Sequence, residues 1–490
     1  MFTASNYSDV LTHFADKHLV TIATGATCAY LGDERNLREF LVADETARWL
    51  RRAGHTVVFF LIDDSLDPLN FRQLRVAVNK NEELVEKFQH WCGKPIAHLP
   101  DPWGCHESYA AHFEEELIDR LHRLDCHPTL VTTAQLYERG VYKPYVTSVL
   151  ERHDEIMAFF AERFPTYTPD KLFWPICPHC RYIHETRVEA IVNSTIEICC
   201  SHCNKRSVVP IAEAEGKLNW KLDCAVRWTL FNIDAEPFNK KYLEPQTGTF
   251  PIAQAVCTEF FDGPDVVPLL YGTTDMNREL SYKLLDSLPP SVLRSMMTER
   301  PATDINLSRE KIMTAVSRFG VLPGLSYLDF IKQLLPMWLL TPEKLTQSQR
   351  DLVANGIAFS QHFLSTDICL QMPRRAHFED QPIPVIREVR NLLREVIRLR
   401  DEENPEWEEF QELIKQIIAT MGTHKGQALH RLRVLVGQEQ GMPAGRFLFV
   451  LPLDYLRVLE YMCDLFVQAN LGMPVDLSIP ALSSPMSVSN

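Results

Sequence analysis

Two C-x2-C pairs are the residues whose type and spacing point most directly to chemistry. Cys177 and Cys180 form the first pair, Cys200 and Cys203 the second, and nineteen residues separate the inner cysteines. Each pair can supply two thiolates to one tetrahedral zinc ion, and the strand-like residues between the pairs are typical of a zinc ribbon. Four thiolates leave no open coordination position, so the sequence predicts a structural zinc; a redox pair of cysteines is the alternative.

A second group of residues could form a pocket for an amino acid. A cationic amino acid needs carboxylates for its ammonium groups and apolar or aromatic walls for its stem. We expect this mixture from residues spread over several segments: Gly25, Thr27, Asp63, Asp64, His106, Glu107, Tyr109, Trp220 and Asp223. The alternative is that Trp220 and Tyr109 are core aromatics, while His106 and the paired acids cap helices.

The elements that must position these residues follow an α/β pattern. Residues 19–24 and 56–62 are short apolar runs typical of buried strands, and 36–52 has helical periodicity between them. Strand, helix and strand in this order predict a parallel sheet with a right-handed crossover. Because ligands bind at the carboxyl ends of such strands, Gly25, Thr27, Asp63 and Asp64 should face one crevice.

Other segments extend this pattern, and from about residue 300 the chain is predicted to be almost entirely helical. A strand is expected at 128–133 and helices at 83–97, 107–125, 145–163, 385–400, 406–421, 424–437 and 453–469. Arginines 387, 390, 394, 398 and 400 either form a solvated helix face or bind RNA phosphates.

The composition restricts the class of protein. The chain has 490 residues and a net charge of −14, which weakens any case for nonspecific nucleic-acid binding, and we expect no DNA partner. A local basic surface for a structured RNA remains compatible with this charge. Without a long apolar run or a signal-like N-terminus, we expect a cytoplasmic protein with no membrane span.

Several blocks, taken in order, resemble the class I lysyl-tRNA synthetases. They include Thr24–Thr27 (TGAT) with Asn36–Glu39 (NLRE), Asp63–Leu69, Asp101–Tyr109, the cysteine pairs, Gly216–Asp223, Arg227–Trp228, Glu236–Phe238 and Leu432–Gly441. The resemblance implies an α/β fold, with a Rossmann-type class I synthetase catalytic core, a zinc-ribbon insertion and an all-α C-terminal region. It also implies lysine or a similar basic amino acid, ATP and tRNA as partners.

The same resemblance suggests a division of the chain. We expect the core at 1–165 and 211–300, the zinc ribbon at 166–210, a connecting helical domain at 301–375, an anticodon-binding-like helical domain at 376–476 and a disordered tail at 477–490.

Three segments depart from the family on the side that should hold ATP. The family's His-Ile-Gly-Asn is replaced by Asp33-Glu34-Arg35-Asn36, and Lys-Met-Ser-Ser/Lys-Ser by Asp275-Met276-Asn277-Arg278-Glu279. The family's Gly-Lys-Asp-His is replaced by Asn239-Lys240-Lys241-Tyr242. Asp33 and Glu34 should repel phosphates, Arg35 should obstruct the adenine, and Arg278 could compensate in part as a phosphate clamp.

These departures leave no catalytic residue assigned, with Asp33, Asn36, Asp275 and Arg278 as remnants of the signatures. We expect a diverged paralogue that keeps a basic amino-acid pocket but has lost or rerouted adenylation, so that it transfers or ligates an aminoacyl group to another acceptor. The first alternative is a divergent lysine–tRNA ligase that uses ATP. The second is a non-catalytic regulator that binds an amino acid or tRNA.

Overall fold

The chain forms two compact units, each described separately. The computed structural model describes residues 3–338, 345–364, 381–435, 445, 448–449, 451 and 453–471. The first unit comprises 1–276 and 294–306, and the second comprises 277–293 and 307–490. The predicted tail at 477–490 lies outside the described residues. The finer division into domains stays a prediction.

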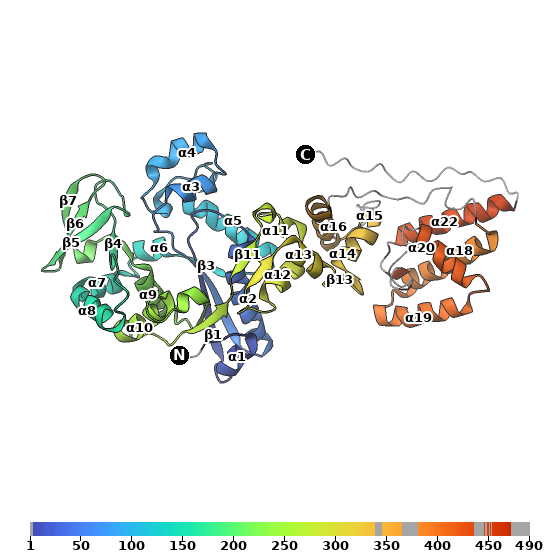
Figure 1. Cartoon of the computed structure of the whole chain (residues 1–490), viewed down its shortest axis with the longest axis horizontal. Helices are drawn as coiled ribbons and strands as arrows, with labels where there is room; N and C mark the ends of the chain where they lie inside the picture. The colour runs from blue at the N-terminus through green and yellow to red at the C-terminus, as the bar shows by residue number, and fades with distance from the viewer. Residues whose placement is uncertain are drawn as a thin grey trace. The chain divides into compact units, whose positions relative to one another are not determined.

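A five-stranded parallel sheet organises the first unit (Figure 1). Its strand order is β10-β9-β1-β2-β3. The bounds are β1 Leu19–Ala26, β2 Thr56–Asp63, β3 Thr129–Thr132, β9 Ala235–Asn239 and β10 Val267–Tyr271. Consecutive residues 20–24 of β1 are all buried, as expected for a strand covered on both faces. The predicted parallel α/β core is confirmed.

The strand order reverses between β1 and β9, and the sheet is weakly paired there. β1 and β2 match over eight residue pairs, from Leu19 with Thr56 to Ala26 with Asp63. β1 and β9 match at one pair only, Ile22 with Ala235. Beyond that pair, the carboxyl-terminal residues of β1 and β9 are not paired with each other. Such a reversal point is where parallel α/β sheets hold their ligands.

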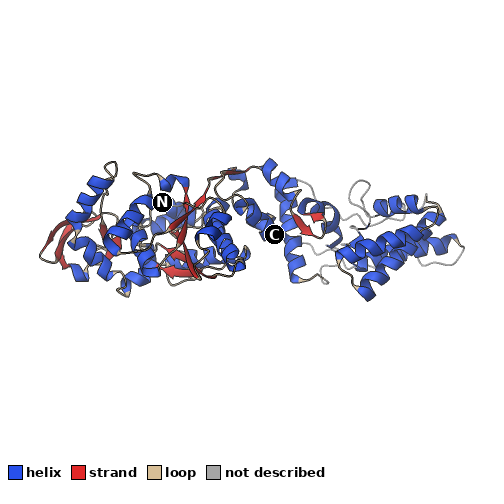
Figure 2. Ribbon diagram, turned by 90° about the horizontal axis from the view of Figure 1, so that it is seen from below, coloured by secondary structure: helices blue, strands red, loops and turns tan. Residues whose placement is uncertain are grey.

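Helices on both faces of the sheet connect these strands (Figure 2). In the first unit the helices and 3-10 turns are α1 Tyr7–His13, η1 Glu34–Asn36, α2 Leu37–Arg52, α3 Phe71–Ala77, α4 Glu82–Phe88, η2 Gln89–Trp91, η3 Ile96–His98, α5 Tyr109–Arg123, α6 Thr133–Glu138, α7 Lys143–Glu151, α8 His153–Arg163, η4 Ile211–Glu213, α9 Trp220–Phe231, η5 Lys240–Leu243 and α10 Thr249–Phe261. The right-handed crossovers β1–α2–β2 and β9–α10–β10 run in opposite directions, so α2 and α10 cover opposite faces.

A small antiparallel sheet carries the two cysteine pairs. It contains β5 Thr186–Val192, β6 Thr195–Cys200 and β7 Lys205–Pro210, drawn in green in Figure 1. The insertion leaves and rejoins the core through the paired strands β4 Phe173–Pro175 and β8 Gly216–Leu218. It also bonds to the core, since the amides of Ile183 and His184 both donate to the Gly93 carbonyl, at 3.0 and 3.1 Å.

The second unit is mainly helical, as predicted. Its elements, with those at its border, are β11 Thr274–Met276, η6 Arg278–Leu280, α11 Leu284–Ser287, α12 Pro290–Thr298, β12 Ile305–Leu307, α13 Arg309–Val316, β13 Gly320–Leu322, β14 Leu325–Ser326, α14 Tyr327–Asp329, η7 Phe330–Leu334, α15 Leu335–Trp338, α16 Gln347–Phe359, η9 Ser360–Leu364, α18 Ile383–Arg398, η10 Leu399–Glu403, α19 Trp407–Thr420, α20 Lys425–Leu435 and α22 Leu453–Asn470.

Two predicted helices are wrong in their extent. The segment 83–97 is helical only to Phe88, followed by two 3-10 turns, because Gly93 and Pro95 interrupt it. The predicted helix 145–163 is two helices that meet at Arg152, whose backbone leaves the helical region with φ −99° and ψ 21°. Within the described residues, no helix has the length and apolar character needed to cross a membrane.

Candidate functional site

Two neighbouring cavities open at the carboxyl ends of β1, β9 and β10. The outer cavity has a volume of about 480 Å³ and the inner cavity about 360 Å³. They share part of their lining: Gly25, Ala26, Thr27, Glu39 and Tyr242. Both lie in the first unit at the reversal point of the sheet, which is the position expected for a ligand site in this topology.

The loop after β1 folds its two unexpected acids away from the outer cavity. The Asp33 side chain caps the 3-10 turn Glu34–Asn36 and accepts hydrogen bonds from the Arg35 guanidinium, at 2.6 to 3.0 Å. Glu34 is only 1% exposed, and neither acid belongs to the lining of the outer or the inner cavity. Arg35 and Asn36 do line the outer cavity, which stays open beside them.

Close packing fixes the shape of this loop. A Cβ atom added to Gly32 would lie 1.8 Å from Nδ2 of Asn36, so no other residue fits there without moving Asn36. The Gly32 carbonyl also accepts a hydrogen bond from Nη1 of Arg120, at 2.9 Å. The loop therefore holds the Asn36 amide against the wall of the outer cavity.

In the Leu-Arg-Glu sequence that begins α2, Arg38 stabilises the fold and Glu39 lines the cavities. The Arg38 guanidinium is buried and donates hydrogen bonds to the backbone carbonyls of six residues: Gly272, Thr273, Met297, Arg300, Pro301 and Thr303. Glu39 lines both cavities and accepts hydrogen bonds from Tyr271 Oη, at 2.6 Å, and Thr24 Oγ1, at 3.0 Å. Burial raises the pKa of Glu39 to about 7, although these two hydrogen bonds oppose the shift.

The outer cavity offers two cations and several aromatic walls. Arg35 and Lys241 are the cationic side chains in its lining, and Lys241 comes from the turn that follows β9. Its neighbour Lys240 pairs instead with Asp304, at 3.2 Å, and does not line the cavity. Aromatic and apolar walls come from α2, α5, β10 and the nearby loops: Tyr30, Leu31, Phe40, Phe113, Leu117, Tyr242 and Tyr271.

The inner cavity contains a buried acid–base pair with unused hydrogen-bonding atoms. Arg227 Nη1 and Asp64 Oδ1 lie 3.6 Å apart, too far for a hydrogen bond, and no described group bonds either atom. Burial raises the pKa of Asp64 to about 6, opposed by the positive charges of Arg227 and Lys217. Buried polar atoms without partners usually mark a place for water or a ligand.

Carboxylates outnumber cations in the lining of the inner cavity. Asp64, Asp67, Glu39 and Glu236 face Arg227 alone, and Asp67 is already bound by Lys217 and by Thr27 Oγ1, the latter at 2.7 Å. Trp220, which is 40% exposed, contacts Tyr242 edge to face at 5.6 Å. Together with Phe238, these rings add apolar surface to a lining rich in carboxylates, a mixture that suits a ligand with an ammonium group and an alkyl stem.

The structure brings together only some of the residues predicted for the pocket. Gly25, Thr27, Asp64 and Trp220 line the inner cavity. Asp63 lies behind it and accepts a hydrogen bond from the Cys28 amide at 2.7 Å, while Asp223 is bound by Tyr137 and Tyr142 hydroxyls. These two buried acids support the site from outside the cavity.

The remaining predicted residues lie elsewhere. Tyr109 is a core aromatic whose hydroxyl donates to the Ala29 carbonyl at 2.7 Å. His106 and the exposed Glu107 belong to the loop before α5, outside both cavities. Asp275 is exposed after β10 and lines neither cavity, and Arg278 is an exposed residue of the second unit.

Sequence reasoning missed several lining residues. Glu39, Asp67, Arg227, Glu236 and Tyr271 are all buried or half-buried in the walls. Four of them stand within or beside the blocks quoted for the family resemblance. An ionisable residue inside an otherwise apolar helix or strand, such as Arg227 in α9, is the sequence feature that could have indicated these lining residues.

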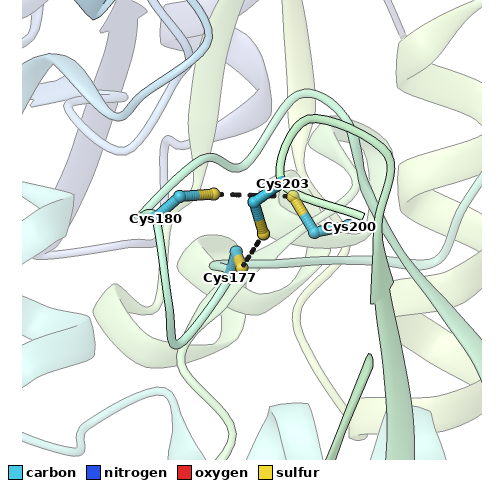
Figure 3. Close-up of side chains that lie close together, drawn as sticks. All are labelled: Cys177, Cys180, Cys200 and Cys203. Carbon is cyan, nitrogen blue, oxygen red and sulfur yellow. Dashed lines mark hydrogen bonds between the residues drawn. The ribbon is translucent and has the colours of Figure 1, made fainter. Parts of the chain in front are cut away.

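The four predicted zinc ligands converge beside one end of the small antiparallel sheet, from the loop before β5 and from the end of β6 and the turn after it (Figure 3). Cys177 and Cys203 sulfurs are 3.7 Å apart, and those of Cys180 and Cys200 are 3.5 Å apart. All four sulfurs lie within 4.8 Å of one another, a spacing that one tetrahedral ion can bridge. The thiol-only donor set therefore fits the predicted structural zinc.

Comparison with known proteins gives one family. The family described as "tRNA synthetases class I (K)" matches residues 4–326. A lysine–tRNA ligase of Archaeoglobus fulgidus is 28% identical over 331 residues, which are 64% of this chain and 61% of that protein. A lysine–tRNA ligase of Methanosarcina barkeri (strain Fusaro) is 28% identical over 57% of this chain and 53% of that protein. The chain thus spans between half and two thirds of the length of these curated relatives.

A search of solved structures gives weaker similarity. A putative arginyl-tRNA synthetase from Campylobacter jejuni has 12% identity and a TM-score of 0.34, with 96% of this chain and 97% of that chain covered. This similarity is too low to bear on the function.

Proposed function

The chain belongs to the class I (K) tRNA synthetase family, and from this premise we propose that it binds lysine or a similar basic amino acid in the inner cavity. We further propose that it has lost or rerouted the ATP-dependent adenylation step. It would then transfer or ligate the aminoacyl group to an acceptor other than the usual one.

The observation that carries the amino-acid proposal is the Asp64–Arg227 pair. An α-amino acid is a zwitterion, so its ammonium group suits the free oxygen of Asp64 and its carboxylate suits the free nitrogens of Arg227. The other carboxylates in the lining suit a second ammonium group at the end of an alkyl stem. These carboxylates already accept hydrogen bonds from protein groups, but the excess of acidic over basic side chains in the lining favours a stem that ends in a cation over a neutral one.

The proposal of lost or rerouted adenylation rests on the three altered segments. Charge that develops on the transferring phosphorus centre is stabilised by fixed cations and hydrogen-bond donors. Asp33 stands where the family has an imidazole, and Asp275 stands where it has a lysine. A preactivated aminoacyl ester would remove the need for these groups, because the acceptor's nucleophile then displaces the ester oxygen directly.

A specific observation favours the alternative of a divergent lysine–tRNA ligase. The outer cavity is open and carries Arg35 and Lys241, which could bind phosphates in place of the family's usual groups. In that case the protein would join lysine to ATP with release of pyrophosphate and then charge tRNA. The inner cavity would have the same role in both proposals.

An assay of lysine- and tRNA-dependent exchange of pyrophosphate into ATP distinguishes the rerouted protein from the lysine–tRNA ligase. We expect the purified full chain to show no exchange above the background without lysine. Robust exchange would falsify the rerouting proposal and establish the ligase. Lysine binding without exchange, and without transfer from lysyl-tRNA to added amines, would support the non-catalytic regulator instead.

Calorimetric titration with lysine tests the amino-acid pocket independently of catalysis. We expect Trp220→Ala to weaken lysine binding by about ten-fold, as loss of a cation–π and stem contact worth about 1 to 2 kcal/mol predicts. Trp49→Ala is the matched control, since Trp49 is similarly exposed, at 39%, and lies on α2 outside both cavities. Equal affinities of the two variants would remove Trp220 from the pocket.

We also propose that Cys177, Cys180, Cys200 and Cys203 hold a structural zinc, and that tRNA remains a candidate partner or donor. Four thiolates close the coordination sphere, so this zinc would stabilise the small sheet and take no part in the reaction. A gel-shift titration with lysine tRNA tests the second point.

A further inference from the structure

We propose that Glu39 is the general base of the aminoacyl transfer: it takes the proton that the attacking acceptor loses and returns it to the leaving oxygen. This role rests on the proposed function, because it belongs to a step of that reaction. The sequence left the catalytic residue unassigned, and Glu39 is one of the lining residues that the sequence did not predict.

Glu39 lies where the two cavities meet. Five residues line both cavities: Gly25, Ala26, Thr27, Glu39 and Tyr242. If the inner cavity holds the amino acid and the outer cavity holds the alcohol part of a preactivated ester, the acyl carbonyl between them must lie at this junction. Among these five residues Glu39 is the one carboxylate, and Thr27 Oγ1 already donates its proton to Asp67, at 2.7 Å.

Three donors fix the orientation of the Glu39 carboxylate. Tyr271 Oη donates to Oε2 at 2.6 Å, and Thr24 Oγ1 donates to Oε1 at 3.0 Å. The backbone amide of Gly25 also donates a hydrogen bond to the group. A carboxylate offers about four lone-pair positions, so a position remains for a proton from the substrate. A base held in this way meets the geometric requirement of proton transfer, which is hydrogen-bond reach to a defined atom.

The surroundings of Glu39 place its titration at neutral pH. Burial raises the pKa of Glu39 to about 7; the hydrogen bonds from Tyr271 and Thr24 oppose the shift, and the charge of Glu236 on β9 adds to it. A general base is most effective when its pKa lies near the working pH. The charged groups that line the cavities with Glu39 are Arg35, Asp64, Asp67, Arg227, Glu236 and Lys241.

The step that Glu39 would assist conserves atoms and electrons. The lone pair of an acceptor amine forms a bond to the carbonyl carbon of the aminoacyl ester. The bond between that carbon and the ester oxygen breaks, and its electron pair stays on the oxygen. Glu39 takes the proton from the nitrogen and passes it to the departing oxygen, so the carboxylate ends the cycle as it began.

Transfer of lysine from lysyl-tRNA to hydroxylamine, measured as the hydroxamate with the full chain, tests this role. At a fixed concentration of neutral hydroxylamine, we expect the wild-type rate to rise with pH and to level off above an apparent pKa of about 7. Glu39→Gln should lower kcat by at least about 100-fold and remove the pH dependence. Its lysine affinity, measured by calorimetry, should change by less than about ten-fold, because the base acts on the reaction and not mainly on binding.

Two further variants serve as comparisons. Glu39→Asp keeps a carboxylate on a shorter side chain, so it should retain the pH dependence at a reduced rate. Glu151→Gln removes an exposed carboxylate of α7 and should keep the wild-type rate and pH profile.

The outcomes separate the role of Glu39 from the proposed function. A Glu39→Gln variant with the wild-type kcat and pH profile would overturn the role of Glu39 and leave the proposed function standing. A wild-type rate that does not fall below about pH 7 would do the same, without any variant that must fold. Absence of transfer by the wild type would overturn both.

Discussion

At the scale of single residues, Glu39 is the group on which the two cavities depend most. It is the one carboxylate in the lining of both, and its hydrogen bonds come from two strands, β1 through Thr24 and β10 through Tyr271. The acid that ends the Leu-Arg-Glu sequence therefore links helix α2 to the sheet at the reversal point.

Its raised pKa predicts how stability varies with pH. Burial moves the pKa of Glu39 from 4.5 to about 7, so the folded protein keeps a proton between these values that the unfolded chain releases. The contribution of Glu39 to stability is therefore greatest below pH 4.5 and falls as the pH rises to 7. At pH 8 the loss amounts to about 3 kcal/mol.

Glu39→Gln, which stays neutral at every pH, should remove this dependence. We expect the variant to match the wild type near pH 5 and to be more stable by up to about 3 kcal/mol at pH 8, in denaturant titrations at both pH values. The exposed Glu151→Gln is the control and should follow the wild type. A Glu39→Gln variant that is less stable than the wild type at pH 8 contradicts the argument.

Lys241 allows a second specific prediction, about ATP binding, because the neighbouring Lys240 supplies an internal control. If the outer cavity binds ATP, Lys241→Ala should weaken that binding by about ten-fold, the effect of removing one charge-assisted bond to phosphate. Lys240→Ala should leave it unchanged, because Lys240 is paired with Asp304 outside the cavity. Fluorescence titration with ATP and Mg²⁺ measures both; equal losses in the two variants would rule out a specific role for Lys241.

At the scale of elements, the ion pairs of α18 and the turn after it bear on the two interpretations of their arginines. Arg390 pairs with Asp464 at 2.9 Å, and Arg394 pairs with Glu460 at 2.5 Å, both on α22. Arg400 donates to the backbone carbonyls of Leu448 and Leu451. Arg390, Arg394 and Arg400 thus make contacts within the second unit, which favours a structural role for these three side chains.

Substitution of the paired arginines should therefore leave RNA binding intact. We expect Arg390→Ala/Arg394→Ala to reduce stability by about 1 kcal/mol, the range of partly exposed ion pairs, with tRNA affinity changed by less than about two-fold. Arg387→Ala, an exposed residue of the same helix, is the comparison. A gel-shift assay over a salt series measures the affinity, and a shallower salt dependence in the double variant would show that the arginines do contact phosphate.

The elements also show how far the sequence could predict the site. Gly25, Thr27 and Asp64 could be placed because parallel strands end at the same edge of a sheet. Arg227 and Glu236 could not, because their position depends on β9 lying beside β1, and no local pattern reports the order of strands. Tyr109 looked like a pocket residue, yet it begins α5 with its ring turned into the core.

The loop at 33–36 illustrates a different limit. The sequence places two acids and an arginine where a nucleotide should bind. It does not show in which direction their side chains point. Asp33 and Glu34 are buried, and Arg35 pairs with Asp33 within the same turn. The amino-acid sequence alone does not show that the Asp33 carboxylate is neutralised by the Arg35 guanidinium two residues later.

At the scale of the whole molecule, the cavities belong to one unit. Every residue that lines them lies in 1–276, while the predicted anticodon-binding-like helices lie in the second unit. A chain truncated before α18, after residue 381, should therefore bind lysine within about two-fold of the full chain, as expected where the removed residues share no contact with the cavity lining. Calorimetry on the two proteins tests this, and loss of lysine binding in a truncated chain that remains folded would contradict it.

The single residue pair between β1 and β9 has a consequence for motion. A ladder that stops at Ile22 and Ala235 leaves the backbone amides beyond it without partners across that boundary, whereas β1 and β2 stay bonded to their ends. Hydrogen exchange should therefore be faster in the last residues of β9 than in β2, and a bound amino acid should slow it. Ligand could enter there without separating any paired strands, so association should be fast, and affinity should be set mainly by how slowly the ligand leaves.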